Sequence, residues 1–437
     1  MSNKILIIGQ GGREHALGYS IAQDPEVDEV LYAKGNPGTA REKKGRNIEL
    51  DGTKKENFKE LADIVEKEDV NQMIVGPEQP LVDGIVDFFN DNGFYDIFGP
   101  RSIASVIEAD KFYSYDLMNC LGIPQAESIL CSTIGEAESA INKMITSMSI
   151  VIKARGLTEG KGIHVCDDKE EALFKLKGHV NKYGPEVLIA ERLFGEEFSV
   201  FGISNGETII PLEMSVQDHK RLLDNDKGPN TGGMGAYGPA LIADSEMIKY
   251  VTETMMTPVV KGMKKDGREY KGFLYAAVII TEQGPKILEY NCRFGDPEAQ
   301  PSVMMFKHGL YQPISTALDG RLNEVNIEFK PGAACCVVMA SNGYPANYEK
   351  ELSIGGLDEV AKLHDVKVFH AGTTINNGRI VTDGGRVLGI TAYSSEGIVS
   401  AQKKAYEAAD IINKASTELN NKITFIYRKD IGSRGLI

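Results

Sequence analysis

The sequence lacks the features that identify several common classes of protein. Six cysteines stand at positions 120, 131, 166, 292, 335 and 336, none in a C-x-x-C pair, so neither a zinc ribbon nor a disulfide framework is predicted. We expect small buried cysteines in a reducing compartment. The apolar run at residues 5–8 is too short for a signal peptide, and no run is long enough to span a membrane. We therefore expect a cytoplasmic protein without a membrane partner.

An excess of basic residues is also absent. The chain has 48 lysines and arginines against 62 acidic residues, a net charge of −14, so binding to nucleic acid, which needs a basic face, is not expected. An anionic substrate must then meet local cations, and screening over about 8 Å at physiological salt lets a basic pocket exist on an acidic protein. With 437 residues, 42% of them hydrophobic, the chain is long enough to bury sizeable cores in about three domains.

Strands and helices alternate along the first hundred residues. Strands are predicted at 4–8, 29–33, 72–75 and 96–98, and helices at 14–23, 58–66 and 81–92. This alternation predicts a doubly wound parallel sheet whose ligand-binding loops follow the carboxyl ends of the strands. We assign it to an N-terminal substrate-binding α/β domain, residues 1–101.

Composition changes after Gly99-Pro100 and again at Pro331-Gly332. The segment between these breaks, residues 102–330, is expected to form a second domain. It opens with a helical stretch at 102–121 and holds a small α+β subdomain at about 124–193. Strands at 335–340, 366–370 and 386–393 and a helix at 398–416 predict a compact C-terminal α+β domain, residues 331–437.

The first strand runs into a glycine loop at residues 9–12, followed by a helix. Glycines let the backbone approach an oxyanion, and a helix N-terminus offers free N–H groups. A dinucleotide fingerprint would need glycine at position 14, which is Glu14, and an acid ending the second strand, where residues 33–34 are Ala-Lys. We therefore predict the phosphate of another ligand, with a structural tight turn as the alternative. Arg13 and His15 stand beside the loop and can complete an anion site.

A second glycine-rich segment follows a predicted strand that ends in Lys153. Residues 153–162 contain three glycines and two lysines, which is typical of a mobile lid over a polyphosphate. It is not a Walker A loop, because Lys161 is followed by Gly162 instead of serine or threonine. An ordinary glycine-rich hairpin is the alternative.

A predicted strand at 187–190 leads into a connector that suits an adenosine. Backbone groups near Glu191 and Leu193 can pair with the adenine edge, and the carboxylate of Glu197 can hold ribose hydroxyls. Surface acids explain this connector about as well.

The predicted strand at 286–291 carries a candidate metal site. A period of two places Glu289 and Asn291 on one face. A carboxylate and an amide oxygen beside a triphosphate predict a Mg²⁺ site completed by phosphate and water. A half-exposed edge strand is the alternative.

The order of these signals resembles the ATP-grasp superfamily, in which two α+β units clamp ATP, and Lys111 matches its first nucleotide lysine. Longer runs are similar to the phosphoribosylamine–glycine ligases (glycinamide ribonucleotide synthetases) over the whole chain. They lie at 11–17, 75–81, 217–221, 228–237, 291–298, 369–373 and 427–432.

The resemblance implies a ligase of purine biosynthesis with an ATP-grasp domain at 102–330. ATP, glycine and 5-phosphoribosylamine would give glycinamide ribonucleotide, ADP and phosphate through glycyl phosphate, on a monomer with Mg²⁺ or Mn²⁺ as cofactor. The metal ligands would be Glu289 and Asn291, and the catalytic residues Arg293, Asp296 and Lys161. The ATP-binding residues would be Lys111, Lys153, Gly160, Gly162, Glu191, Leu193 and Glu197. The substrate-binding residues would be Gly11, Gly12, Arg13, Glu14, Pro77, Glu78, Asp218, His219, Lys220, Gly232 and Gly233.

Arg155 departs from the family pattern, which has an acid at this position. Two interpretations are open: a further cation on the phosphates, or, as we favour, a side chain that points to solvent and only shifts the balance between the open and closed lid. Other readings of the whole chain are an ATP-grasp carboxylase acting on bicarbonate and a nucleotide-sensing protein without turnover. The first would lack the runs at 217–221 and 293–298, and the second would lack the lid lysine or the metal pair.

Overall fold

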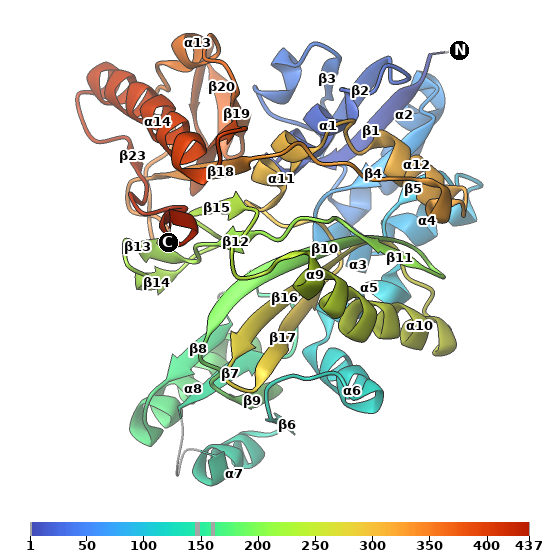
Figure 1. Cartoon of the computed structure of the whole chain (residues 1–437), viewed down its shortest axis with the longest axis vertical. Helices are drawn as coiled ribbons and strands as arrows, with labels where there is room; N and C mark the ends of the chain where they lie inside the picture. The colour runs from blue at the N-terminus through green and yellow to red at the C-terminus, as the bar shows by residue number, and fades with distance from the viewer. Residues whose placement is uncertain (1, 145–148, 159–161, 437) are drawn as a thin grey trace.

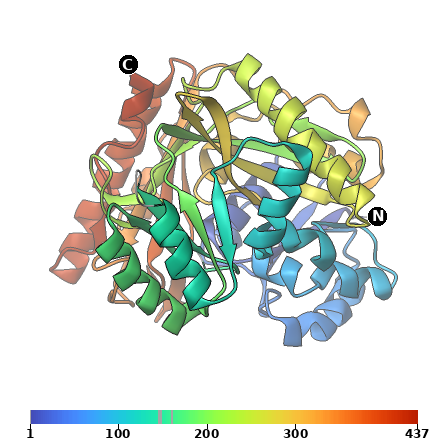
Figure 2. The ribbon, with the colours of Figure 1, turned by 90° about the horizontal axis from the view of Figure 1, so that it is seen from below.

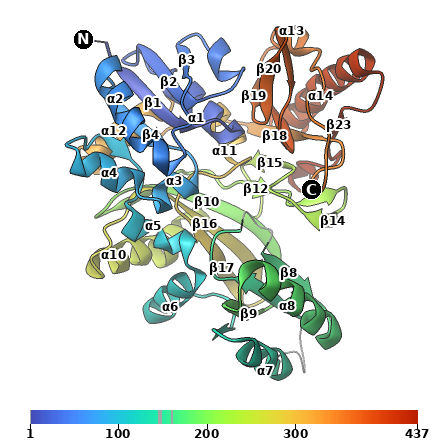
Figure 3. The ribbon, with the colours of Figure 1, turned by 180° about the vertical axis from the view of Figure 1, so that it is seen from behind.

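The computed structural model describes residues 2–144, 149–158 and 162–436. The N-terminal and C-terminal parts of the chain lie side by side at one end of the long central sheet, and a smaller sheet lies at the other end (Figure 1). The view from behind shows the same arrangement (Figure 3).

The N-terminal domain is built on a five-stranded parallel sheet in the order β3-β2-β1-β4-β5. Its strands are β1 (Lys4–Gly9), β2 (Glu29–Lys34), β3 (Gly45–Ile48), β4 (Gln72–Val75) and β5 (Ile97–Phe98). Its first two helices are α1 (Gly12–Ile21) and α2 (Phe58–Glu68). The predicted doubly wound sheet is confirmed. Strand β3 was not predicted, because its sequence GRNI has a single apolar residue.

Two predicted helices are each divided in two. The stretch at 81–92 forms α3 (Glu78–Val82) and α4 (Ile85–Asp91), because Gly84 between them takes the left-handed conformation, with φ +89°. The stretch at 102–121 forms α5 (Ser102–Ala109) and α6 (Lys111–Leu121).

Asp110 causes the second division. Its backbone is extended, and its side chain accepts hydrogen bonds from the N–H groups of Phe112 and Tyr113. This is N-capping, in which a side-chain oxygen satisfies amides that the first helical turn leaves free. Helix α6 therefore begins at Lys111.

The central sheet is antiparallel, in the order β11-β10-β16-β17. Its strands are β10 (Glu196–Asn205), β11 (Ile209–Pro211), β16 (Lys271–Thr281) and β17 (Gly284–Asn291). Helices α9 (Ser245–Val251) and α10 (Thr257–Lys265) lie in front of it in Figure 1. One hydrophobic cluster joins this sheet, α10 and the N-terminal domain, so the site between them rests on a shared core.

A small sheet in the order β6-β9-β7-β8 lies in the segment predicted to form a lid, and this segment is called the lid below. Its strands are β6 (Ser128–Cys131), β7 (Ile150–Ala154), β8 (Ile163–Cys166) and β9 (Val187–Glu191). Helices α7 (Ile134–Met144) and α8 (Lys169–Tyr183) lie side by side on it (Figure 2). It has a hydrophobic cluster of its own, so it packs as a separate unit.

The C-terminal sheet has six strands, in the order β12-β15-β18-β22-β19 with β23 beside β18. Strands β12 (Gln217–Asp218) and β15 (Gly235–Gly238) come from the middle of the chain, so the sheet crosses the predicted boundary at residue 331. The others are β18 (Ala333–Ser341), β19 (Val366–His370), β22 (Arg386–Ser394) and β23 (Phe425–Ile426). Helix α14 (Ile398–Asn420) packs on β18 and β22.

Smaller elements connect these sheets. They are the hairpins β13 (Arg221–Leu223) with β14 (Lys227–Asn230) and β20 (Thr373–Asn376) with β21 (Arg379–Thr382), and helices α11 (Ala299–Met305), α12 (Tyr311–Leu318) and α13 (Leu357–Val360). In the described parts of the chain, no helix has the length and hydropathy to cross a membrane.

Candidate active site

A cavity of about 820 Å³ opens where the N-terminal loops, the central sheet, the lid and the C-terminal domain meet. Many of the residues predicted from the sequence line it: Gly11, Arg13, Glu78, Lys111, Lys153, Asp218, Lys220, Gly232, Glu289, Asn291, Arg293 and Asp296. Gly160 and Lys161 lie outside the described residues.

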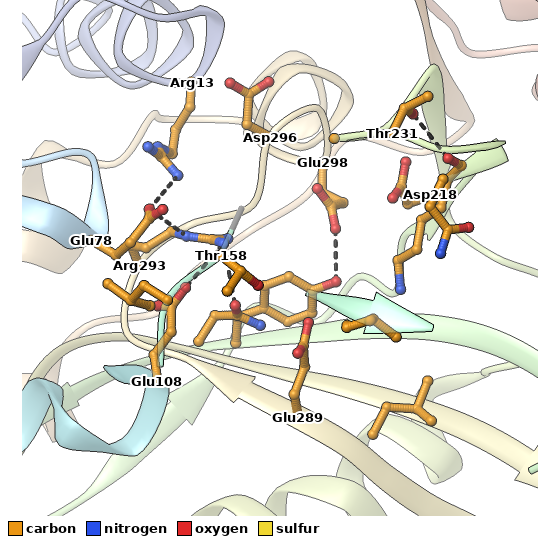
Figure 4. A pocket seen from close by; sticks show the side chains of 18 of the residues that line it. Arg13, Glu78, Glu108, Thr158, Asp218, Thr231, Glu289, Arg293, Asp296 and Glu298 are labelled. Atoms are coloured by element: carbon orange, nitrogen blue, oxygen red, sulfur yellow. Dashed lines mark hydrogen bonds and ion pairs between the residues drawn. The ribbon is translucent and has the colours of Figure 1, made fainter. Parts of the chain in front are cut away.

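Arg293 lies in a network of charged side chains on one wall (Figure 4). Its Nε is 3.2 Å from Glu78 Oε2, and its Nη2 is 3.2 Å from Glu108 Oε1. Burial alone would lower the pKa of Arg293, but the two carboxylates outweigh this effect and raise it. Glu78 also faces Arg13 at 3.9 Å. Arg293 is therefore a permanently charged group held in a fixed position.

Glu289 and Asn291, at the end of β17, both line the cavity. The Asn291 Oδ1 accepts a hydrogen bond from Arg293 Nη2 at 3.2 Å and keeps a second lone pair. Across the described chain, the Glu289 carboxylate has no hydrogen bond or ion pair with another side chain. Burial raises its pKa, but Lys111 and Lys220, with other cations, outweigh burial and lower it. An ionised, unpaired carboxylate beside an amide oxygen fits a hard divalent cation that takes its remaining ligands from phosphate and water.

Lys111 and Lys153 approach the same region from two different elements. Lys153 lies on β7 and donates to the carbonyl oxygen of Leu288 at 3.4 Å. Lys111 begins α6 and donates to the carbonyl of Gly156 at 3.0 Å. Burial lowers the pKa of Lys153, and Glu289 partly offsets this effect. The site thus concentrates cations around one free carboxylate, which suits a polyphosphate with a metal ion.

Buried carboxyl groups also lie near Lys220. The Asp218 Oδ1 is buried without a hydrogen-bond partner in the described chain. Burial, together with the nearby Glu298, raises the pKa of Asp218 well above its ordinary value. Glu298 accepts a hydrogen bond from the Tyr275 hydroxyl at 2.8 Å, and Lys220 pairs with Glu197 at 2.7 Å. A cationic substrate group would supply a partner for the free oxygen and would favour the ionised form of Asp218.

The N-terminal glycine loop holds a carboxylate of the protein itself. The Gly11 N–H donates to Glu14 Oε2 at 2.7 Å. A Cβ atom at Gly9, Gly11 or Gly76 would lie 2.6, 2.7 or 2.3 Å from the Glu14 side chain. The glycines therefore make room for Glu14, which is a structural reason for the loop that the sequence did not reveal.

Several predicted residues lie outside the cavity lining: Gly12, Glu14, Pro77, Gly162, Glu191, Leu193, Glu197, His219 and Gly233. His219 follows Asp218, and its ring is buried, 6.0 Å from that of Tyr237. In the connector, the Glu191 carboxylate accepts from the Glu127 N–H at 3.0 Å. The Leu193 N–H has no partner in the described part of the chain, so it is free to pair with a ligand.

Arg155 lies outside the cavity lining and makes ion pairs that were not predicted from the sequence. Its guanidinium donates to both carboxylate oxygens of Asp110, at 3.0 and 2.6 Å, and to Glu186 at 2.6 Å. The side chain is 40% exposed and does not line the cavity, as the favoured interpretation expects, but these carboxylates also hold it against α6.

The cavity also contains residues that sequence reasoning missed: Lys34, Glu108, Tyr275, Glu298 and Arg386. Glu298 ends a motif that carries the family resemblance, which was the available signal. Arg386 donates to the carbonyl oxygens of Gly232 and Asp296, both at 2.6 Å, and nothing in its local sequence distinguishes it from a surface arginine.

Comparison with known proteins accounts for nearly the whole chain. Phosphoribosylglycinamide synthetase family models match here: the N domain at residues 3–108, the ATP-grasp (A) domain at 109–299 and the C domain at 334–434. Phosphoribosylamine–glycine ligase of Rhodopirellula baltica is 41% identical over 99% of this chain and 98% of its own. The trifunctional purine biosynthetic protein adenosine-3 of Gallus gallus is 40% identical over all of this chain and 42% of its own.

A solved structure leads to the same family. The crystal structure of phosphoribosylamine–glycine ligase from Thermotoga maritima superposes with a TM-score of 0.81 at 33% identity, covering 98% of this chain and 99% of that one. The chain belongs to the phosphoribosylamine–glycine ligase family.

Proposed function

We propose that this protein joins glycine to 5-phosphoribosylamine at the expense of ATP, giving glycinamide ribonucleotide, ADP and phosphate in purine biosynthesis. The observation that carries the proposal is the Glu289 carboxylate, which pairs with no described side chain and lies near Lys111, Lys153 and Lys220 in the cavity. We assign substrate binding to residues 1–101, the ATP-grasp clamp to 102–330 with its lid at about 124–193, and the C-terminal wall to 331–437.

ATP binds between the lid and the central sheet. The free Leu193 N–H and the neighbouring backbone at Glu191 pair with the adenine edge, and Glu197 approaches the ribose. Lys111 and Lys153 contact the phosphates, together with the lid residues Gly160, Lys161 and Gly162. Glu197 pairs with Lys220 in the structure, so it must exchange this partner to hold ribose hydroxyls.

Glu289 and Asn291 would hold Mg²⁺ or Mn²⁺, which neutralises charge on the transferred phosphoryl group. The geometry fits, because two oxygen donors suit an ion that binds mainly through phosphates and water. Arg293, fixed by Glu78 and Glu108, adds a cation that needs no rearrangement during the reaction.

The reaction takes two steps. A carboxylate oxygen of glycine attacks the γ-phosphorus, the bond from that phosphorus to the bridging oxygen of ADP breaks, and glycyl phosphate forms. The amine of 5-phosphoribosylamine then attacks the carbonyl carbon, and phosphate leaves with the oxygen that came from glycine. Asp218 holds the ammonium group of glycine, and Asp296 lies beside the reacting carboxyl. Closure of the lid excludes water from the acyl phosphate.

The phosphoribosyl group lies against the N-terminal domain. Glu78 is positioned for its hydroxyls, and Lys34 lines the cavity with no ion pair to any described residue. The Arg13 guanidinium already forms an ion pair with the Glu14 carboxylate at 2.7 Å, so Lys34 is the better partner for the substrate phosphate.

Phosphate release tests the function. The purified protein should release phosphate from ATP only when both glycine and 5-phosphoribosylamine are present, and mass spectrometry should identify glycinamide ribonucleotide. Release that needs bicarbonate instead of glycine would establish a carboxylase. Nucleotide binding without any release would establish a sensor.

A further inference from the structure

Arg155 connects three elements of the ATP site. It follows β7 directly, and its guanidinium clasps the carboxylate of Asp110, the N-cap of α6. It also pairs with Glu186, the residue before β9. The Phe112 ring lies 4.9 Å below the guanidinium carbon. One side chain therefore spans β7, which carries Lys153, α6, which begins at Lys111, and β9.

The main chain reinforces this connection. The Lys111 N–H donates to the carbonyl oxygen of Arg155 at 2.9 Å, and the Lys111 ammonium donates to the carbonyl of Gly156 at 3.0 Å. Lys111 is therefore held at its backbone and at its side chain by the two residues that follow β7. A displacement of Arg155 would move both contacts.

The two carboxylates that Arg155 contacts act differently. Glu186 belongs to the lid subdomain, where its carbonyl already accepts from the Arg155 N–H at 3.3 Å. Asp110 lies outside the lid, on the segment between α5 and α6. Of the two ion pairs of Arg155, the one with Asp110 crosses from the lid to the helix that bears the other nucleotide lysine.

We infer that Arg155 is a positioning residue for ATP: through Asp110 it holds Lys111 in register with Lys153, without touching the nucleotide itself. Arg155 does not line the cavity, and each of its three guanidinium nitrogens donates to a carboxylate, so direct phosphate contact is not its role. The bidentate geometry suits this role, because two parallel hydrogen bonds fix direction as well as distance. The inference rests on the proposed function, since it assigns Lys111 and Lys153 to ATP.

Steady-state kinetics and MgADP calorimetry on the full-length enzyme test the inference. Arg155→Met should raise the KM for ATP about fivefold, the upper range for a partly exposed ion pair, and weaken MgADP equally. The kcat should change by less than about twofold and the KM for glycine should not change, because the reaction centre is untouched. Arg155→Lys should rescue part of the effect. Lys175→Met is the matched control, since it removes a lid cation that pairs with Glu171 on α8.

A double-mutant cycle identifies the partner. Asp110→Asn keeps an oxygen to cap α6 but loses the ion pair, so it should reproduce Arg155→Met. The double variant should be no worse than either single variant. Glu186→Gln should have a smaller effect.

Three outcomes overturn the inference while leaving the function intact. The first is that Arg155→Met has the same KM for ATP and the same MgADP affinity as Lys175→Met. The second is that the effects of Asp110→Asn and Arg155→Met add in the double variant. The third is that Arg155→Met impairs kcat and the KM of every substrate equally and lowers the melting temperature. A wild-type enzyme without glycine-dependent phosphate release would overturn the proposed function instead.

Discussion

The Glu14 carboxylate accepts a hydrogen bond from the Gly11 N–H at 2.7 Å and pairs with the Arg13 guanidinium at 2.7 Å. Both side chains are buried. The glycine loop that precedes α1 is thus closed by a carboxylate of its own helix. Glu14 therefore stabilises the loop from within and does not line the cavity.

Replacing Glu14 should mainly destabilise the protein. Glu14→Ala leaves the buried Arg13 without its closest partner, and we expect the free energy of unfolding to fall by about 3 kcal/mol, as for other broken buried pairs. Chemical denaturation measures the change. Glu349→Gln breaks the exposed pair with Lys422 and should cost at most about 1 kcal/mol. A Glu14→Ala enzyme of normal stability with a raised substrate KM would instead make Glu14 a ligand.

Glu289→Gln should abolish chemistry but spare nucleotide binding. The carboxylate would hold the metal ion at the developing charge, so turnover should fall at least about 100-fold. ADP affinity measured without metal should change little. Glu282→Gln, at the turn between β16 and β17, is the control and should behave as wild type. Turnover close to normal at moderate Mg²⁺ would contradict the metal assignment.

Lys34→Met should weaken the phosphoribosyl substrate selectively. Loss of one charge-assisted phosphate contact is expected to raise the KM for 5-phosphoribosylamine about tenfold, equivalent to about 1.4 kcal/mol. The KM for ATP should stay the same. Lys54→Met, which removes an exposed lysine of the same domain, should change neither constant. Equal changes in the KM for 5-phosphoribosylamine and the KM for ATP would show that Lys34 supports the structure of the site and does not bind the phosphate.

Isotope transfer tests the proposed intermediate. When glycine carries ¹⁸O in its carboxyl group, attack on the γ-phosphorus places one labelled oxygen in the released phosphate. Mass spectrometry of the phosphate should therefore detect the label. Unlabelled phosphate, with the expelled carboxyl oxygen found in water instead, would exclude glycyl phosphate.

Stability should decrease in mild acid because of buried neutral histidines. Burial, assisted by nearby cations, lowers the pKa of His219 to about 4, and burial lowers that of His370 to about 3. Below the ordinary value of 6.5, the unfolded chain binds protons that the folded chain does not, so the free energy of unfolding falls as the pH drops from 6.5 toward 4. Melting temperatures across this range measure the slope. His219→Leu should make it shallower, and an unchanged slope would exclude His219 as a contributor.

The sequence predicted the parts of the fold that depend on periodic burial. Strands β1 and β4 are continuous apolar runs, and α2 shows helical spacing, so local pattern and tertiary position agree. The breaks at Gly84 and Asp110 escaped prediction, because a left-handed glycine and a side-chain cap leave the hydrophobic pattern almost unchanged.

The candidate site also contains residues that could be predicted from the sequence and residues that could not. Glu289 and Asn291 could be placed together because a strand fixes which side chains share a face. The Arg155–Asp110 pair could not, since 45 residues separate its members and only the docking of the lid on α6 joins them. Asp218 and His219 are adjacent polar residues in one motif, and the sequence does not tell which of the two side chains faces the ligand and which faces the core.

The sheet that joins β12 and β15 to β18 has a consequence for how this enzyme can be rearranged by recombination. The C-terminal portion is not an exchangeable cassette, because its sheet already contains the strand that carries Asp218. A crossover at residue 331 would pair β15 with a foreign edge, and a truncation there would leave that edge open to aggregation. Surviving chimeras should therefore inherit residues 217–238 and the C-terminal portion from the same parent.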